Sequence, residues 1–130
     1  MSDKMKILYV EDEPQLRMAM ADELSDLGLI VKACADGLEA FKALQSDAFD
    51  AVITDLRMPN LDGIGLRKLV TEQKSPSPPV WIALTAYSED NPESFKKLGF
   101  DELFYKPFKP KLLVGMCQKL LHIKRASKVA

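Results

Sequence analysis

Short apolar runs alternate along this chain with segments in which apolar residues recur every three or four positions. The runs at 6–10, 30–34, 51–54, 80–84 and 102–105 have the length of β-strands. Runs of this length bounded by turn residues are typical of strands, whereas the wider spacing is typical of helices with one buried face. The alternation predicts strand–helix units around a parallel sheet, and five strands with five helices account for the whole chain.

The predicted helices have recognisable ends. Proline is tolerated in a first helical turn, where its missing N–H has no partner, and three helices begin in this way, at Pro14, Pro92 and Pro110. The side chains of Asp62 and Asn91 can cap two helix beginnings, and Gly28 and Gly99 can end two helices. The stretch Ser75–Pro79 is too rich in proline for a helix and predicts a short connector.

The helical spacing also assigns the residues that should face the core. They are Leu16, Met20, Leu24 and Leu27; Leu38, Phe41 and Leu44 in the helix Gly37–Ser46; Leu66, Leu69 and Val70; and Leu113, Met116, Cys117, Leu120 and Leu121. The run 51–54 suits a strand covered on both faces, whereas the more polar run 30–34 suits a sheet edge. The predicted architecture is a doubly wound α/β sandwich, which binds ligands at the carboxyl ends of its strands.

Length and composition restrict the class of protein. The chain has 130 residues, 47% of them hydrophobic, which suits one domain that folds without a disulfide or metal. No apolar run approaches the ~20 residues that cross a bilayer, and the first residues show no secretory signal. Cys34 and Cys117 lack metal-site spacing and are expected to be free, buried thiols in a reducing compartment. The single histidine, His122, is expected on the surface, which excludes a Ser-His-Asp or Cys-His triad.

The net charge of −1 conceals an uneven distribution. Residues 1–95 carry 9 basic and 17 acidic side chains, and residues 96–130 carry 9 basic and 2 acidic ones. This pattern predicts an acidic surface with a basic last helix and tail, and it does not favour nucleic-acid binding. We expect Lys124, Arg125 and Lys128 to form a solvated end; the alternative is the beginning of a link to an output domain.

Polar side chains gather where the predicted strands end. Glu11 and Asp12 follow the first strand, Asp55 the third, Thr85 the fourth and Lys106 the fifth. Three carboxylates at neighbouring strand ends repel one another unless a cation neutralises them, and their hard oxygen ligands suit Mg²⁺. A lysine and a hydroxyl opposite them suit a phosphoryl group beside that metal.

Four stretches carry these residues: Ile7–Pro14, Asp55–Gly63, Ala83–Ala86 and Lys106–Phe108. In this order and spacing they resemble the receiver domains of bacterial two-component response regulators. The resemblance covers about residues 5–122, and it predicts a single receiver domain over 1–130 with a basic tail at 123–130. It implies a flavodoxin-like α/β fold, with five helices around a doubly wound five-stranded parallel sheet in the order 2-1-3-4-5.

The resemblance implies a signalling phosphoacceptor, not an enzyme that acts on a separate substrate. Asp55 would be the nucleophile that takes a phosphoryl group from a phosphohistidine of a partner kinase. Mg²⁺ (or Mn²⁺) would be held by Asp12, by Asp55 and by the backbone carbonyl of Arg57, with Glu11 acting through a water.

Other residues would bind the phosphoryl group itself. The resemblance implies that Lys106 pairs with one phosphoryl oxygen, while the Thr85 hydroxyl and the Ala86 backbone N–H bind others. The Lys106–Pro107 bond corresponds to one that is commonly cis in the family, and only a bond before proline adopts the cis form at low cost.

Two positions depart from the family pattern. Glu11 stands where aspartate is commoner, which lengthens the reach to a metal, and Leu103 stands at the switch position, which is usually Tyr or Phe. Tyr105 lies on the same side of its strand and is a candidate for part of the switch role; the alternative is that it packs against the last helix. Arg57 and Tyr87 flank the site at positions that resemble those tuning the lifetime of the phosphoryl group.

The resemblance also implies partners and a location. We expect a cytoplasmic protein that binds a sensor histidine kinase or phosphotransfer protein and a downstream protein effector, with no direct contact to nucleic acid or membrane. Family partners use the first helix, here near Glu13–Met20, or the face of the fourth helix, fifth strand and fifth helix. A monomer, or a weak dimer through that second face, is expected.

Three other interpretations fit parts of the pattern. An aspartate-nucleophile phosphatase of the haloacid dehalogenase type would need a second aspartate two residues after Asp55, where Arg57 stands. A receiver-fold interaction module that is never phosphorylated would lack part of the site, whereas all of its residues are present. A calcium loop at Asn60–Gly63 would need the remaining ligands of an EF-hand, which are missing.

Overall fold

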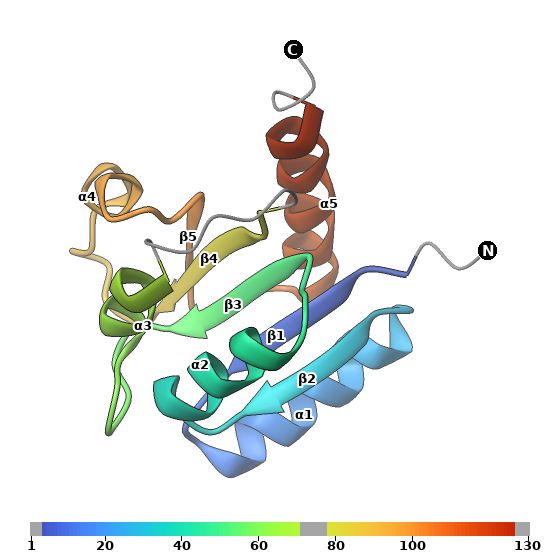
Figure 1. Cartoon of the computed structure of the whole chain (residues 1–130), viewed down its shortest axis with the longest axis horizontal. Coiled ribbons are helices and arrows are strands. Elements are labelled where there is room, and N and C mark those ends of the chain that lie inside the picture. The colour runs from blue at the N-terminus through green and yellow to red at the C-terminus, as the bar shows by residue number, and fades with distance from the viewer. Residues whose placement is uncertain (1–3, 71–77, 127–130) are drawn as a thin grey trace.

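A computed structural model describes residues 4–70 and 78–126 of the chain. These residues form one five-stranded sheet with helices on both of its faces (Figure 1). The proline-rich connector expected at 75–79 lies mostly outside the described residues, as does Lys128.

The sheet has the predicted strand order, β2-β1-β3-β4-β5, and every neighbouring pair is parallel. The strands are β1 Lys6–Val10, β2 Ile30–Cys34, β3 Ala51–Asp55, β4 Val80–Thr85 and β5 Glu102–Tyr105. Every residue of β3 and β4 is buried, whereas exposed and covered residues alternate along most of β2. The prediction of a buried third strand and an edge second strand is therefore confirmed.

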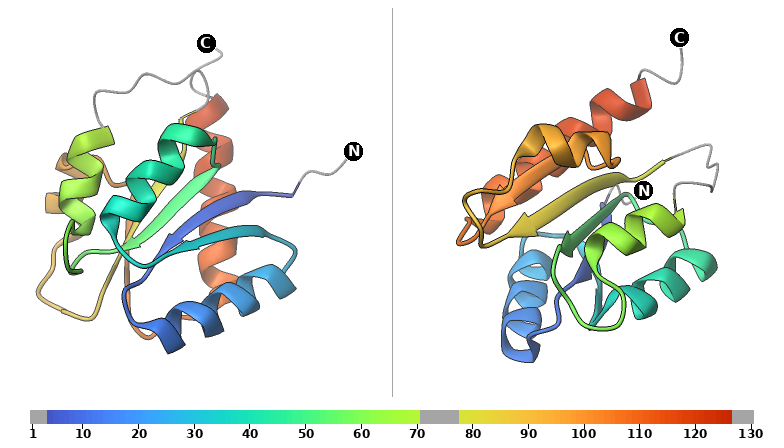
Figure 2. Two further views of the ribbon diagram at one scale, coloured as in Figure 1. Left: turned by 60° about the horizontal axis from the view of Figure 1, so that its bottom comes forward. Right: turned by 90° about the vertical axis from the view of Figure 1, so that its left-hand side faces the viewer.

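Five helices cover the sheet: α1 Pro14–Asp26, α2 Gly37–Ser46, α3 Gly63–Val70, α4 Pro92–Lys97 and α5 Pro110–Ala126. α1 and α5 lie on one face, and α2, α3 and α4 lie on the other (Figure 2). In β1, Ile7 and Tyr9 pack toward the first pair of helices, while Leu8 and Val10 pack toward the other three. This two-sided cover explains why the strands are nearly continuous apolar runs. Among the described residues, no helix has the length and apolar character that crossing a membrane requires.

The helix ends predicted from the sequence are confirmed. The side chains of Asp62 and Asn91 accept hydrogen bonds from first-turn backbone N–H groups at 2.7 and 2.8 Å. Gly28 and Gly99 follow helix ends with φ of 93° and 101°, a left-handed conformation that glycine adopts without a Cβ clash.

Four leucines predicted to face inward are instead exposed: Leu16 39%, Leu27 37%, Leu38 49% and Leu69 47%. The prediction was wrong because helical spacing identifies residues on one side of a helix but not the width of the stripe that its neighbours cover. In α2 the small residues Gly37 and Ala40 make the fully buried contact, and in α1 only Leu24 is fully buried.

The last helix is longer than expected. α5 continues to Ala126, beyond residue 122, where the core was expected to end. Lys124 Nζ lies 2.9 Å from Asp101 Oδ2 and 2.8 Å from the carbonyl oxygen that precedes β4, and Arg125 Nη1 lies 3.0 Å from Asp50 Oδ1. A solvated end is therefore the wrong description of these two residues, because acceptors at the amino-terminal ends of the strands bind them.

The expectations for the two cysteines and for the histidine are confirmed. Cys34 and Cys117 are both buried and free. His122 is exposed on α5, so it contributes no buried catalytic group.

Gly63 allows the backbone after β3 to approach α3 closely. A Cβ at this position would overlap the backbone oxygen of Asp55 and lie 3.2 Å from Leu56 Cα. We predict that Gly63→Ala lowers the free energy of unfolding by about 2 kcal/mol, because rigid backbone must move to relieve the overlap. Urea denaturation measures this change.

Gly115 provides the matched control, because it lies inside α5 with no atom within 4 Å of an added Cβ. Gly115→Ala should raise the free energy of unfolding by about 0.5–1 kcal/mol, the helix propensity difference between the two residues. Equal stability of the two variants would contradict the close approach at Gly63.

Candidate functional site

The carboxyl ends of four strands place the candidate residues at one edge of the sheet. Glu11 directly follows β1, and Asp55 ends β3, which pairs with β1 through the Val10–Thr54 register. Thr85 ends β4, and Lys106 follows β5 on the far side. The strand order, in which β1 and β3 are neighbours, brings together residues that are distant in the sequence.

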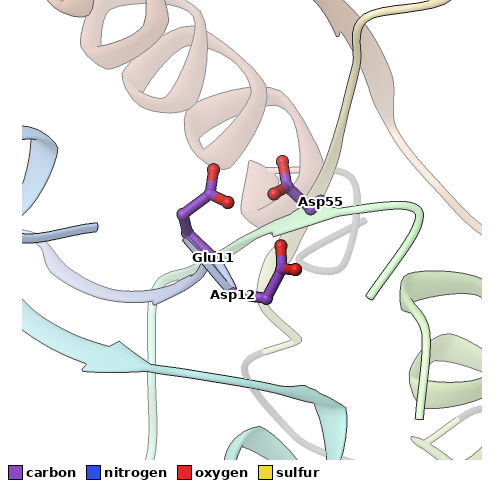
Figure 3. Close-up of side chains that lie close together, drawn as sticks. All are labelled: Glu11, Asp12 and Asp55. Atoms are coloured by element: carbon purple, nitrogen blue, oxygen red, sulfur yellow. The ribbon is translucent and has the colours of Figure 1, made fainter. Parts of the chain in front are cut away.

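Three carboxylates converge at this edge. Glu11, Asp12 and Asp55 each offer an oxygen, and these oxygens all lie within 4.8 Å of one another. Figure 3 shows the three side chains directed toward one another. Glu11 is 2% and Asp55 5% exposed, whereas Asp12 is exposed at the mouth of the site. The cluster is therefore two buried acids with one acid open to solvent.

Lys106 neutralises part of this charge. Its Nζ lies 2.6 Å from Asp55 Oδ1 and 3.0 Å from Glu11 Oε1. The Lys106–Pro107 peptide bond is cis, as the resemblance implied. The second oxygen of Glu11 is also held in place, since Oε2 accepts a hydrogen bond from the Glu13 N–H at 3.1 Å.

The two buried acids respond differently to their surroundings. Burial, reinforced by the neighbouring Glu11, raises the pKa of Asp55 from 3.8 to about 7, although Lys106 acts in the opposite direction. Burial would also raise the pKa of Glu11, but hydrogen bonds involving Asp55, the Glu13 N–H and Lys106 outweigh it and leave the pKa below its ordinary value. The carboxylates of the site consequently carry more negative charge than one lysine balances.

These residues fit a hard divalent cation. Asp55 Oδ1 is buried, and among the described residues it has no hydrogen-bond partner of good geometry besides its ion pair with Lys106. An ion ligated by carboxylate oxygens and water would satisfy this atom and balance the excess charge, which is the chemistry of Mg²⁺ sites. Glu11, Asp12 and Asp55 are the side chains positioned to hold it.

A second group of side chains surrounds Thr85. Its Oγ1 donates to Asp90 Oδ2 at 2.5 Å and accepts from the Tyr87 N–H at 3.0 Å and from Arg57 Nη1 at 3.3 Å. Arg57 also forms a two-point ion pair with Asp90, at 3.0 and 3.2 Å, and its guanidinium lies 4.2 Å from the centre of the Tyr87 ring. Hydrogen bonds from Arg57 hold the pKa of Asp90 below its ordinary value, so this carboxylate is an acceptor.

Asp90 is the residue that sequence reasoning missed. It follows Thr85 by five residues in a polar loop, and no spacing rule distinguishes it there from its neighbour Glu89. Only the folded loop shows that Asp90 turns back to Thr85 and Arg57, with its side chain 12% exposed.

Leu103 and Tyr105, the residues considered for the switch role, occupy different environments. Leu103 is 6% exposed and belongs to the core beneath α2, α3 and α4. Tyr105 is 39% exposed, and its hydroxyl donates to the backbone oxygen of Asp90 at 2.6 Å. The polar contact of Tyr105 is therefore with the loop after β4.

Comparison with known proteins agrees with this geometry. Residues 7–118 match the family model described as the response regulator receiver domain. The sensor histidine kinase RcsC of Salmonella typhimurium is 34% identical over 106 residues, which are 82% of this chain and 11% of that protein. The probable transcriptional regulator ycf27 of Guillardia theta is 34% identical over 128 residues, 98% of this chain and 48% of that protein. The chain thus spans half or less of these relatives' length.

Two solved structures are similar to this chain over nearly their full length. The receiver domain of sensor histidine kinase PA1611 from Pseudomonas aeruginosa, with a magnesium ion in its active site cleft, matches at a TM-score of 0.82 and 29% identity. That match covers 92% of this chain and 98% of the other. The response regulator TrrA from Thermotoga maritima, in complex with Mg²⁺-BeF, matches at a TM-score of 0.77 and 31% identity, over 89% and 98% of the two chains.

The raised pKa of Asp55 predicts a pH-dependent stability in metal-free buffer. Protonation favours the folded state, so this stabilisation is complete below pH 4 and is lost as the pH rises through about 7. Asp55→Asn should therefore exceed the wild type by about 1–3 kcal/mol in unfolding free energy at pH 8, at roughly 1.4 kcal/mol per pKa unit. Urea denaturation at pH 4 and pH 8 measures the difference, which should shrink at pH 4.

Mg²⁺ should stabilise the wild type at pH 8 and stabilise Asp55→Asn much less, because the variant lacks one carboxylate ligand. Asp62→Asn is the matched control, since Asp62 is exposed and asparagine caps helices as well as aspartate. If Asp55→Asn and Asp62→Asn have the same free energy of unfolding at pH 8, the carboxylates of the buried acid pair do not repel each other as described.

Proposed function

Because the chain belongs to the response regulator receiver domain family of two-component signalling systems, we propose that Asp55 is its phosphoacceptor. The placement of Asp55 carries this proposal: it is buried at the end of β3, between two further acids and the Lys106 ammonium. The phosphatase interpretation has no comparable support, because Arg57 stands where that chemistry needs a second aspartate.

In the proposed reaction, a carboxylate oxygen of Asp55 forms a bond to phosphorus while the bond from phosphorus to the donor imidazole nitrogen breaks. The electron pair of that bond stays with the donor nitrogen, which takes a proton from solvent, and Asp55 becomes an acyl phosphate. Lys106 Nζ, which lies 2.6 Å from Asp55 Oδ1, would pair with a phosphoryl oxygen as the charge moves there. Positioning and charge compensation therefore supply most of the catalysis.

A divalent cation completes this proposal. Glu11, Asp12 and Asp55 would hold Mg²⁺ or Mn²⁺ together with the backbone carbonyl of Arg57. When bound, the ion would neutralise charge between Asp55 and the incoming phosphoryl group. The magnesium ion described for the PA1611 receiver domain supports this assignment by similarity.

The remaining oxygens of the phosphoryl group would be bound by the Thr85 hydroxyl and the Ala86 backbone N–H. Leu103, buried at the family's switch position, offers no hydroxyl, so we assign part of the switch role to Tyr105. Its hydrogen bond to the loop that carries Thr85 supports this assignment, because movement of the loop would change the environment of Tyr105.

The proposed donor is a sensor histidine kinase or phosphotransfer protein that docks on α1. A groove of about 440 Å³ runs between this helix and the segment after β5, and its lining residues are Tyr9, Leu16, Met20, Lys106, Pro107 and Phe108. On α1, Leu16, which lines the groove, and Met18 expose 39% and 66% of their surface. An apolar surface next to the site suits a helical phosphodonor.

The proposed output is a phosphorylation-dependent contact with an effector protein in the cytoplasm. The face formed by α4, β5 and α5 exposes Tyr105 and Leu112, the latter at 65%, and suits either an effector or a weak dimer. We assign the described residues to one receiver domain whose only chemistry is its own phosphorylation and dephosphorylation.

Incubation with acetyl phosphate, a small-molecule acyl phosphate, tests the phosphoacceptor directly. With Mg²⁺ the intact mass of the wild type should increase by one phosphoryl group, and without Mg²⁺ the gain should fall at least tenfold in rate. Asp55→Asn should show no gain, because the amide is not a nucleophile at this position.

Asp62→Asn serves as the control for general loss of an acid near the site. It should be phosphorylated at the wild-type rate. A folded wild type that gains no mass from any phosphodonor would favour the interaction module that is never phosphorylated.

A further inference from the structure

Asp90 joins three parts of the molecule that surround the proposed phosphoryl site. Its carboxylate accepts from the Thr85 hydroxyl at 2.5 Å and forms the two-point ion pair with Arg57, and its backbone oxygen accepts from the Tyr105 hydroxyl at 2.6 Å. We call these contacts the Asp90 bridge. The bridge links the end of β4, the segment after β3 and the end of β5.

The hydrogen-bonding capacity of Thr85 is fully used in this arrangement. A hydroxyl has one proton to donate and two lone pairs that accept. The hydroxyl donates its proton in a hydrogen bond to Asp90, while its lone pairs accept from the Tyr87 N–H at 3.0 Å and from Arg57 Nη1 at 3.3 Å. A phosphoryl oxygen accepts but does not donate at neutral pH, so Thr85 cannot bind it without releasing Asp90.

We propose that Asp90 is a positioning residue that competes with the phosphoryl group for the Thr85 hydroxyl. This inference rests on the proposed function of Asp55 and Thr85. In the unphosphorylated protein Asp90 is the anionic acceptor of this hydroxyl, in place of the phosphoryl group. Arg57 holds Asp90 in place through its Nη1 and Nη2. Capture of Thr85 by the phosphoryl group breaks one arm of the Asp90 bridge.

The loss of that arm has a consequence at the surface. The Tyr105 hydroxyl is anchored to the same residue, on the exposed end of β5. When Asp90 loses Thr85, its side chain is held by Arg57, and its N–H still donates to the Tyr87 backbone oxygen at 3.2 Å. The Asp90 bridge thereby connects the phosphoryl site to the α4-β5-α5 face through a residue of this chain, without an aromatic ring at Leu103.

Beryllofluoride with Mg²⁺, an analogue of the phosphoryl group, tests the competition. Asp90→Ala should bind the analogue about tenfold more tightly than the wild type, because a hydrogen bond to a charged acceptor no longer has to be broken. In a Thr85→Val background, which removes the contested proton, the same Asp90→Ala substitution should change affinity less than threefold. Titration followed by the fluorescence of Trp81 or by calorimetry measures all four proteins of this double-mutant cycle.

Glu89→Ala is the matched control, because Glu89 is an exposed acid of the same loop whose carboxylate makes no recorded hydrogen bond to any described residue. It should stay within threefold of wild-type affinity, which separates the competition from a general reduction of negative charge. Equal or weaker binding by Asp90→Ala, or an equal gain in the Thr85→Val background, overturns the proposal.

Hydrogen exchange of the Tyr87 amide in the analogue-free protein provides a second measurement. This N–H donates to Thr85 Oγ1, so Asp90→Ala should speed its exchange at least tenfold, and Asp90→Asn, which keeps one acceptor oxygen, should speed it less. A wild type that fails to bind the analogue contradicts the proposed function, and the exchange rates then decide alone whether Asp90 restrains Thr85. Unchanged exchange in Asp90→Ala overturns the restraint.

Discussion

Two buried carboxylates that share one lysine are the constraint on which the site depends. Glu11 and Asp55 lie at neighbouring strand ends, and removing both from water is unfavourable unless positive charge accompanies them. Lys106, which follows the edge strand β5, contacts both carboxylates, but its single charge balances only one of the two. Burial, reinforced by the neighbouring Glu11, raises the pKa of Asp55. The remaining negative charge makes the site receptive to a divalent cation.

The fold brings these charges together with little freedom to separate. β1 and β3 are adjacent and central, so their last residues cannot move apart without breaking the sheet. Gly63 brings the beginning of α3 against the backbone of Asp55, which fixes the position of this residue. The apolar residues of both faces thus hold in place an arrangement of like charges that would otherwise disperse.

A second ion pair lies on the other side of Thr85. Arg57 pairs with Asp90, as Lys106 pairs with Asp55. Thr85 stands between the two pairs and has a single proton to give. A phosphoryl group on Asp55 would compete with Asp90 for that proton, so a small chemical change at one strand end would alter the loop after β4 and the contact of Tyr105.

The sequence by itself determined the helix ends at Asp62 and Asn91 and the set of Glu11, Asp12, Asp55, Thr85 and Lys106, because these follow from local spacing and from a parallel sheet collecting its carboxyl ends at one edge. The strand order was implied by the resemblance to receiver domains. The sequence did not determine which leucines are buried, since Leu38 and Leu69 depend on how much of each helix the neighbouring elements cover. Nor did it place Lys124 and Arg125 against Asp101 and Asp50, or Asp90 against Thr85. These pairs join residues whose distance is set by packing, and polar side chains in loops and last turns carry no periodicity that would reveal a partner. Only the tertiary structure decided them.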